Sequence, residues 1–162
     1  MNTKEPAEGS KIYFYNTVLG SIAIESRGDF ISGLYFPSVH SKASQQRPEE
    51  TEAIAEAYRQ LLEYLSGNRK KFDLKLKFTG TEFQKLLWKT LLSIPYGNTC
   101  SYSQVAMAMG KKSAARAVGM ACGRNPISIF VPCHRVIGSR GGLVGYSGGV
   151  EIKKMLLDLE KS

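Results

Sequence analysis

The sequence predicts an α+β protein built from two small domains, residues 1–78 and 79–162. The first half alternates short β-rich runs with turn residues, whereas the second half carries helical stripes that begin at capping residues. The positive charge is just as uneven. Residues 1–79 contain 11 basic and 10 acidic side chains, and residues 80–162 contain 11 basic and 4 acidic ones. This concentration of charge favours a phosphate-binding surface in the second half.

The first half predicts a three-stranded sheet followed by a helix and one further strand. Strands are expected at 11–15, 21–26 and 30–36, because β-rich residues there are separated by glycine-containing turns. A helix is expected over 50–65, and its apolar stripe consists of Ala53, Ile54, Ala57, Tyr58, Leu61, Leu62 and Leu65. Apolar and polar residues alternate over 72–78, which predicts a half-buried strand. This half gathers no catalytic residue types, so we expect it to be structural.

Two capping boxes open helices in the second half, Thr81 with Gln84 and Ser101 with Gln104. The stripe of the first helix consists of Phe83, Leu86, Leu87, Leu91 and Ile94. The second helix is short and ends at Gly110. Ser113 is then expected to cap a third helix that runs to about residue 122. Two short helices joined by a tight turn predict a helix-turn-helix, in which the second helix is expected to contact DNA.

The last predicted helix covers 151–160, and its expected inward residues are Ile152, Met155, Leu156 and Leu159. Between the helix-turn-helix and this helix lies a glycine-rich segment, 138–149, which contains Tyr146 and Ser147. Such a segment either lets backbone amides approach a ligand closely or forms a plain hairpin.

The pair Cys133-His134 is the most chemically specific feature of the chain. It lies in a stretch, 83–150, that contains eight basic residues and no acidic one. Cationic neighbours favour the thiolate form of a cysteine, so this setting predicts a nucleophile that works on a polyanion. Adjacent side chains rarely touch, so His134 is expected to act through a bridging water. Glu160, the last acid of the chain, is the candidate that orients this histidine.

The cysteines and histidines admit other interpretations. A zinc site would need finger-like ligand spacing, which Cys100, Cys122, Cys133 and His134 do not show. A papain-like protease would need a distant histidine, and His40 lies in a polar loop. The interpretation of Cys133-His134 as a buried, non-catalytic thiol beside a hydrogen-bonded histidine stays open. Three cysteines without an export signal predict free thiols in a cytoplasmic protein, and no apolar run approaches the length of a membrane span.

Residues 132–136, Pro-Cys-His-Arg-Val, are preceded by Gly123-Arg124-Asn125-Pro126 and followed by Gly-Tyr-Ser-Gly-Gly at 145–149. With residues 80–84, 102–103 and 114–119, this pattern resembles the O6-alkylguanine-DNA alkyltransferases. The resemblance runs through the second half. It implies an RNase-H-like sheet domain at the N-terminus and a winged-helix-like helix-turn-helix domain for alkyl transfer at the C-terminus.

The resemblance implies that Cys133 takes the alkyl group from guanine O6 in one irreversible transfer, without a cofactor or metal. His134 would relay the thiol proton, Glu160 would orient His134, and Tyr102 would donate a proton toward the departing guanine. The remaining pocket residues it implies are Asn125, Val136, Tyr146 and Ser147.

The same resemblance implies that Arg116 fills the space left in the duplex by an extruded nucleotide. Ala114 and Ala115 would fit a minor groove because they are small, and the other implied DNA contacts are Ser103, Lys111 and Ser139. The expected partner is duplex DNA containing O6-alkylguanine, bound by a monomer. Action on O4-alkylthymine and cooperative assembly on DNA stay open. Two alternatives are a non-catalytic module that binds the lesion, which would lack the nucleophile, and a cysteine hydrolase.

Overall fold

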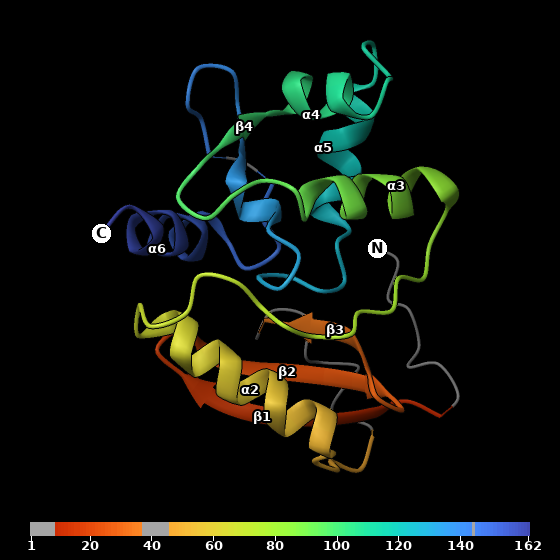
Figure 1. The fold of residues 1–162 in the computed structure, drawn as a ribbon, viewed down its shortest axis with the longest axis vertical. Coiled ribbons are helices and arrows are strands. Elements are labelled where there is room, and N and C mark those ends of the chain that lie inside the picture. Colours follow the sequence, from red (N-terminus) through yellow and green to blue (C-terminus); the bar gives the residue numbers. More distant parts are fainter. Residues whose placement is uncertain (1–8, 37–45, 144) are drawn as a thin grey trace. The chain divides into compact units, whose positions relative to one another are not determined.

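The computed structural model describes residues 9–36, 46–143 and 145–162. The chain divides into two compact units, Met1–Lys77 and Phe78–Ser162 (Figure 1). In its described residues the first unit is a small antiparallel sheet with one helix, and the second unit is mainly helical, so the predicted α+β class is confirmed. Among the described residues, no helix has the length and apolar character needed to cross a membrane.

The sheet of the first unit has the order β1-β2-β3 and consists of β1 (Lys11–Thr17), β2 (Gly20–Arg27) and β3 (Phe30–Tyr35). Helix α2 (Glu52–Leu65) packs against β2 and β3 (Figure 1). Thr51 caps α2 by accepting the backbone N–H of Ile54. The core between sheet and helix is aliphatic and aromatic, and includes Ile12, Ile22, Ile24, Ile31, Leu34, Ile54, Leu61 and Tyr64.

Two predictions for the first unit are corrected. Leu62 is 44% exposed, and Tyr64 is buried in its place, because the inward face of α2 is centred on Ile54, Ala57 and Leu61. The strand expected at 72–78 is reduced to a single parallel bridge between Ile31 and Leu76. The alternation of burial is present there, but a side chain of α2 takes the backbone groups at residue 73 that a neighbouring strand would otherwise bind.

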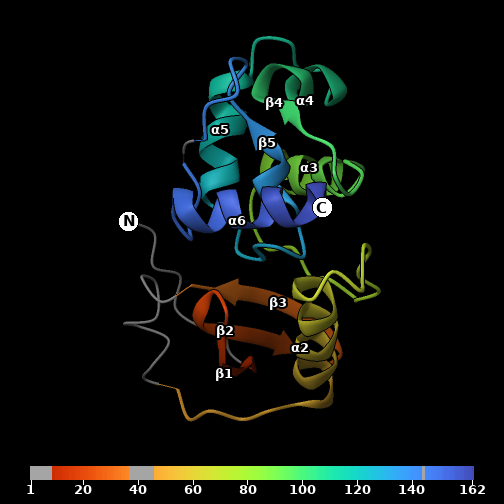
Figure 2. The same cartoon turned by 90° about the vertical axis from the view of Figure 1, so that its left-hand side faces the viewer.

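The second unit surrounds a short parallel pair, β4 (Cys100–Ser101) and β5 (Val136–Ile137), with four helices (Figure 2). These are α3 (Glu82–Leu91), α4 (Tyr102–Ala108), α5 (Ala115–Gly123) and α6 (Val150–Lys161). Both predicted capping boxes are present, at Thr81 and Ser101. Helices α4 and α5 pack together across a tight turn, as a helix-turn-helix requires.

Three details of this unit differ from expectation. Ser113 does not cap α5, because the helix starts one residue later, with Ala114 as its N-cap and no side-chain bond. On α3, Leu86 is 41% exposed and Trp88 is buried in its place. The indole Nε1 of Trp88 donates to the carbonyl of Ala121 at 3.2 Å, and this bond ties α3 to α5. On α6, Met155 is 46% exposed rather than inward.

Candidate active site

Cys133 and His134 lie in a single 3₁₀ turn, η2 (Cys133–Arg135), directly before β5. Cys133 is 4% exposed, and His134 is fully buried. With three residues per turn, neighbouring side chains of a 3₁₀ helix point about 120° apart. The turn therefore sends the thiol and the imidazole into different surroundings, and each has its own set of contacts.

The thiol of Cys133 is held by Asn125. The Nδ2 of Asn125 donates to Cys133 Sγ at 3.2 Å and to the carbonyl of Val131 at 3.1 Å. The Oδ1 of Asn125 accepts the backbone N–H of Ile127 at 3.0 Å, so both ends of the amide have a partner. The structure therefore places Asn125, which the resemblance implied as a pocket residue, against the sulfur atom itself.

The expectation that the cationic stretch 83–150 supports a resting thiolate is wrong. Burial raises the pKa of the Cys133 thiol to about 11, and the hydrogen bond from Asn125 and the charge of Lys153 only partly oppose this. The cation that acts on the thiol lies on α6, outside the cationic stretch. Cys133 is therefore a protonated thiol at neutral pH in the free protein.

Lys153 is a functional candidate that the sequence analysis missed. Its side chain is 1% exposed, and its Nζ donates to the carbonyl of Val136 at 2.6 Å. Burial lowers the pKa of Lys153, whereas the thiols of Cys133 and Cys122 raise it. A signal was available in the sequence. If Glu160 faces the site, then the positions three, four and seven residues earlier share its face, and the last of these is Lys153.

Glu160 hydrogen-bonds with three residues around the 3₁₀ turn, namely His134, Arg135 and Gly97. Its Oε1 lies 2.8 Å from His134 Nε2, and the guanidinium of Arg135 donates to both carboxylate oxygens, at 2.9 and 2.8 Å. The backbone N–H of Gly97 also donates to Glu160, at 3.3 Å. Arg135 also donates to the carbonyl of Ile94 at 2.7 Å. The structure thus brings together His134 and Glu160, which lie 26 residues apart in sequence.

The charge state of His134 follows from these contacts. Burial lowers the pKa of His134, and the neighbouring carboxylate of Glu160 opposes that shift without reversing it. His134 is therefore neutral at physiological pH. Because the carboxylate, neutralised by Arg135, accepts from Nε2–H, the lone pair of the imidazole lies on Nδ1. Nδ1 is then the atom that can receive a proton.

Tyr102 opens α4, and its ring packs against Gly119 of α5, where an added Cβ would lie 3.7 Å from the ring. Burial raises the pKa of Tyr102, and the thiols of Cys122 and Cys133 raise it further. The phenol therefore stays protonated and able to donate a hydrogen bond near the sulfur. The proton-donor role that the resemblance implied for Tyr102 stays a prediction.

The glycine-rich segment, 138–149, is bound to the residues just before the 3₁₀ turn through one hydrogen bond. The hydroxyl of Ser147 shares a 3.1 Å hydrogen bond with that of Ser128, and Tyr146 beside it is buried. Val136 is also buried, and its carbonyl accepts the bond from Lys153. Gly145 has a φ of +68°, a conformation that favours glycine just before this pair.

The residues expected to contact DNA lie on the helix-turn-helix and on the loop after β5. Ser103 of α4 and Lys111 of the turn are exposed, and so is Arg116 in the first turn of α5. Ala114 and Ala115 are partly exposed at the start of the same helix, and Ser139 is exposed in the loop. Met120, 56% exposed on α5, is a larger side chain than the small residues anticipated for this helix.

Comparison with known proteins gives two matching family models. Residues 82–162 match the 6-O-methylguanine DNA methyltransferase DNA-binding domain, and residues 11–78 match the ribonuclease-like domain of the same family. A methylated-DNA–protein-cysteine methyltransferase of Methanosarcina barkeri is 54% identical over 114 residues, which cover 70% of this chain and 72% of the relative. One of Mycobacterium tuberculosis is 42% identical over 152 residues, 91% and 92% of the two chains.

Solved structures agree. The crystal structure of Mycobacterium tuberculosis OGT in complex with DNA is similar with a TM-score of 0.86 and 41% identity, over 93% of this chain and 92% of that one. The two family models together account for nearly all of the described chain, one for each compact unit. The chain therefore belongs to the 6-O-methylguanine DNA methyltransferase family.

Proposed function

We propose that this protein repairs duplex DNA by transferring the alkyl group of O6-alkylguanine to Cys133 in a single irreversible step. The relatives named as methylated-DNA–protein-cysteine methyltransferases support this function. The observation that carries it is the setting of one buried thiol. Asn125 donates to Cys133 Sγ, the charge of Lys153 acts on it, and His134 of the same turn contacts Glu160 of α6.

The chemistry begins with a proton transfer, because Cys133 rests as a thiol. His134 Nδ1 would accept that proton through a bridging water, and the imidazolium so formed would be stabilised by Glu160. The thiolate then attacks the alkyl carbon. The new C–S bond forms as the C–O bond breaks, and its electron pair passes to guanine O6. Tyr102 would donate a proton to the guanine ring, and the proton held by His134 would pass through water to the Tyr102 phenolate, so that overall guanine gains the proton that the thiol loses.

The charge of Lys153 would matter most at the moment when the thiolate exists. A buried thiolate is costly unless a positive group compensates it, and the ammonium of Lys153 lowers the pKa of Cys133. The hydrogen bond to Val136 holds Lys153 in place for that role. Lys153 is thus a positioning and charge-compensating residue in this proposal.

Base flipping is part of the proposal. The sulfur belongs to a residue that is only 4% exposed, so it cannot meet the O6 of a guanine that remains stacked in the duplex. The damaged nucleotide must therefore leave the stack and enter the site. Arg116, exposed in the first turn of α5, would occupy the space it vacates, and the partly exposed Ala114 and Ala115 would allow that helix to lie close to the groove.

We further propose that the protein acts as a monomer in the cytoplasm and that each molecule acts once. All three cysteines are free, and a nucleophilic thiol has to stay reduced, which suits a reducing compartment. The product is a thioether, and removal of its alkyl group would have to expel the Cys133 thiolate, a poor leaving group, so the alkylated cysteine does not regenerate by itself.

The test is to incubate the reduced protein with duplex DNA containing O6-methylguanine and to weigh the intact protein. We expect one methyl group per molecule, located on the peptide that contains Cys133, and no further repair at excess substrate. Cys133→Ala should still bind the damaged duplex and leave the methyl group in place. A wild-type protein that binds the lesion but never removes the methyl group would overturn the proposal in favour of a lesion-binding module.

A further inference from the structure

The first unit carries three lysines on one exposed edge, in the extended segment that follows α2. Lys71, Lys75 and Lys77 are exposed, and they form what we call the lysine strip. The apolar residues between them are partly buried, namely Phe72, Leu74 and Leu76. Because alternate side chains of an extended segment point to opposite sides, the three ammonium groups share one side.

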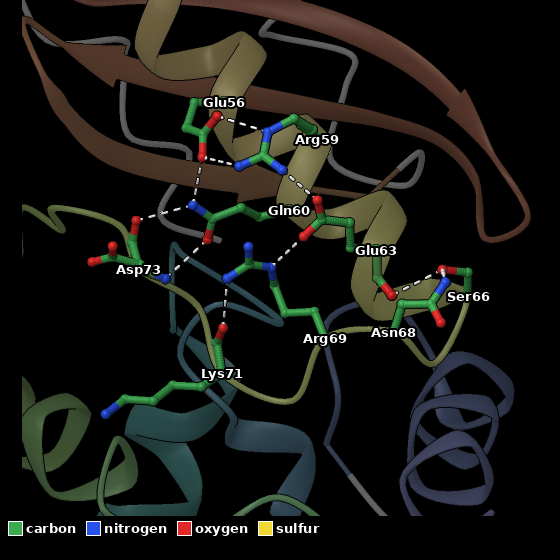
Figure 3. A network of polar contacts seen from close by, with 9 residues as sticks. All are labelled: Glu56, Arg59, Gln60, Glu63, Ser66, Asn68, Arg69, Lys71 and Asp73. Carbon is green, nitrogen blue, oxygen red and sulfur yellow. Dashed lines mark hydrogen bonds and ion pairs between the residues drawn. The ribbon is translucent and has the colours of Figure 1, made fainter.

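The backbone beneath the strip is fixed from the helix side. Gln60 of α2, itself 2% exposed, donates to the carbonyl of Asp73 at 3.0 Å and accepts its N–H at 2.9 Å. Arg69 donates to Glu63 at 2.7 Å and to the carbonyl of Lys71 at 2.9 Å. Figure 3 shows this network, with the side chain of Lys71 extending away from it.

The same backbone is fixed from the sheet side. Ile31 of β3 donates its N–H to the carbonyl of Lys75 at 2.8 Å, and its carbonyl accepts the N–H of Lys77 at 2.9 Å. The backbone of the strip is therefore held by β3 at Lys75 and Lys77, and at Lys71 by Arg69, which is itself bound to Glu63 of α2. Such preorganisation reduces the entropy that a binding partner would have to remove.

The charges of the strip are not neutralised within the protein. Three other basic side chains of the first unit have acidic partners: Lys11 pairs with Glu49, Arg59 with Glu56 and Glu63, and Arg69 with Glu63. In the described part of the chain, no acidic group lies within ion-pair distance of Lys71, Lys75 or Lys77. Asp73 shares their edge, but one carboxylate leaves an excess of positive charge.

We propose that the lysine strip is a second DNA contact, in which Lys71, Lys75 and Lys77 bind backbone phosphates without reading sequence. This rests on the proposed function, which supplies DNA as the polyanion, and it assigns a binding role to the unit expected to be only structural. Lys75 and Lys77 stand about 6.6 Å apart along an extended chain. That spacing suits neighbouring phosphates of one DNA strand, which rise 3.4 Å or so along the helix axis and lie further apart than this through space because the strand winds round the axis.

The test compares two triple variants of the full-length protein on undamaged duplex DNA. Lys71→Gln, Lys75→Gln and Lys77→Gln together remove the strip, and Lys11→Gln, Arg27→Gln and Arg47→Gln remove the same charge elsewhere in the first unit. Each phosphate contact contributes about −0.9 to the slope of log affinity against log salt. Loss of the strip should make the slope shallower by about 2.7. The ratio of wild-type affinity to strip-variant affinity should therefore fall about 40-fold between about 50 and 200 mM salt.

A variant that is expected to raise the affinity for DNA strengthens the test. Asp73→Asn removes the one negative charge on the strip while the hydrogen bonds at that residue, which its backbone makes, stay in place. It should therefore bind DNA more tightly than wild type. Equal slopes for the two triple variants, or a slope unchanged by loss of the strip, would overturn the inference.

The outcome is separable from that of the proposed function. Methyl transfer to Cys133 is measured at saturating DNA, where a lost phosphate contact no longer limits the reaction. If wild type transfers the methyl group and the strip variant keeps the wild-type salt slope, the inference alone fails. Unfolding curves that superimpose for wild type and the strip variant are expected, because exposed lysines are replaced by a polar residue of similar length.

Discussion

The ammonium group of Lys153 donates a 2.6 Å hydrogen bond to the carbonyl oxygen of Val136, three residues after the nucleophilic Cys133. This bond joins α6 to the strand that follows the 3₁₀ turn. A lysine that is 1% exposed has to be held by such a partner, because a buried ammonium is otherwise costly. The position of the charge near the thiol is therefore set by packing, and its consequences can be measured.

Replacing Lys153 by methionine should slow methyl transfer. The change keeps a long side chain but removes the positive charge and leaves the Val136 carbonyl without this donor. If the ammonium stabilises the transient thiolate by about 1.5–3 kcal/mol, as interactions with a charged group commonly do, the single-turnover rate should fall about 10- to 100-fold when it is removed. The matched control is Lys154→Met, because Lys154 is the next residue in the chain but is exposed and pairs with Asp158. Equal rates for the two variants would remove Lys153 from the chemistry.

Replacing Glu160 by glutamine should lower stability as well as activity. The substitution leaves Arg135 buried without its counter-charge, and losing one partner of a buried pair costs about 3–5 kcal/mol. The free energy of unfolding is measured in urea, with Asp158→Asn on the same helix as an exposed control. Transfer should also slow more than DNA binding weakens, because the imidazolium of His134 loses its acceptor. A transfer rate equal to that of wild type would show that Glu160 does not assist His134.

The resting thiol of Cys133 should be unreactive in the absence of DNA. Its pKa is raised from 9.0 to about 11, so the protonated form dominates below pH 9 and the thiolate appears only as the pH approaches 11. Near neutrality its thiolate fraction should be about 100-fold smaller than that of an ordinary cysteine. The rate of alkylation by iodoacetamide is followed at Cys133 and at Cys100, a partly exposed cysteine, by mass spectrometry. Faster alkylation of Cys133 at neutral pH would contradict the expectation.

Replacing Arg116 by alanine should weaken binding to damaged DNA by more than one phosphate contact explains. Its side chain is exposed in the first turn of α5, where it would both neutralise charge and fill the space of the flipped base. Arg124→Ala is the control, since Arg124 is exposed at the end of the same helix. The ratio of affinities for damaged and undamaged duplex should fall for Arg116→Ala and stay constant for Arg124→Ala. An unchanged ratio for both would make Arg116 a simple phosphate contact.

Several elements follow from the sequence alone because their causes are local. The capping boxes at Thr81 and Ser101 form as predicted, since each needs only a hydroxyl and a glutamine three residues apart. The turns between β1, β2 and β3 are likewise local, and the three strands appear where β-rich residues are separated by glycine. The family was recognised in the same way, because each motif that carries the resemblance is a short contiguous run, such as 132–136 and 145–149.

Other features were decided by tertiary structure. The segment 72–78 has a strand-like alternation, yet Gln60 competes for the backbone of Asp73, so only Leu76 pairs with β3. The protonation of Cys133 could not be predicted from neighbouring charges in the sequence. Burial outweighs those charges, and the cation that reaches the thiol comes from α6, twenty residues later. Sequence determines which groups are available, and packing determines which of them lose water and meet, because desolvation depends on every element that surrounds a group.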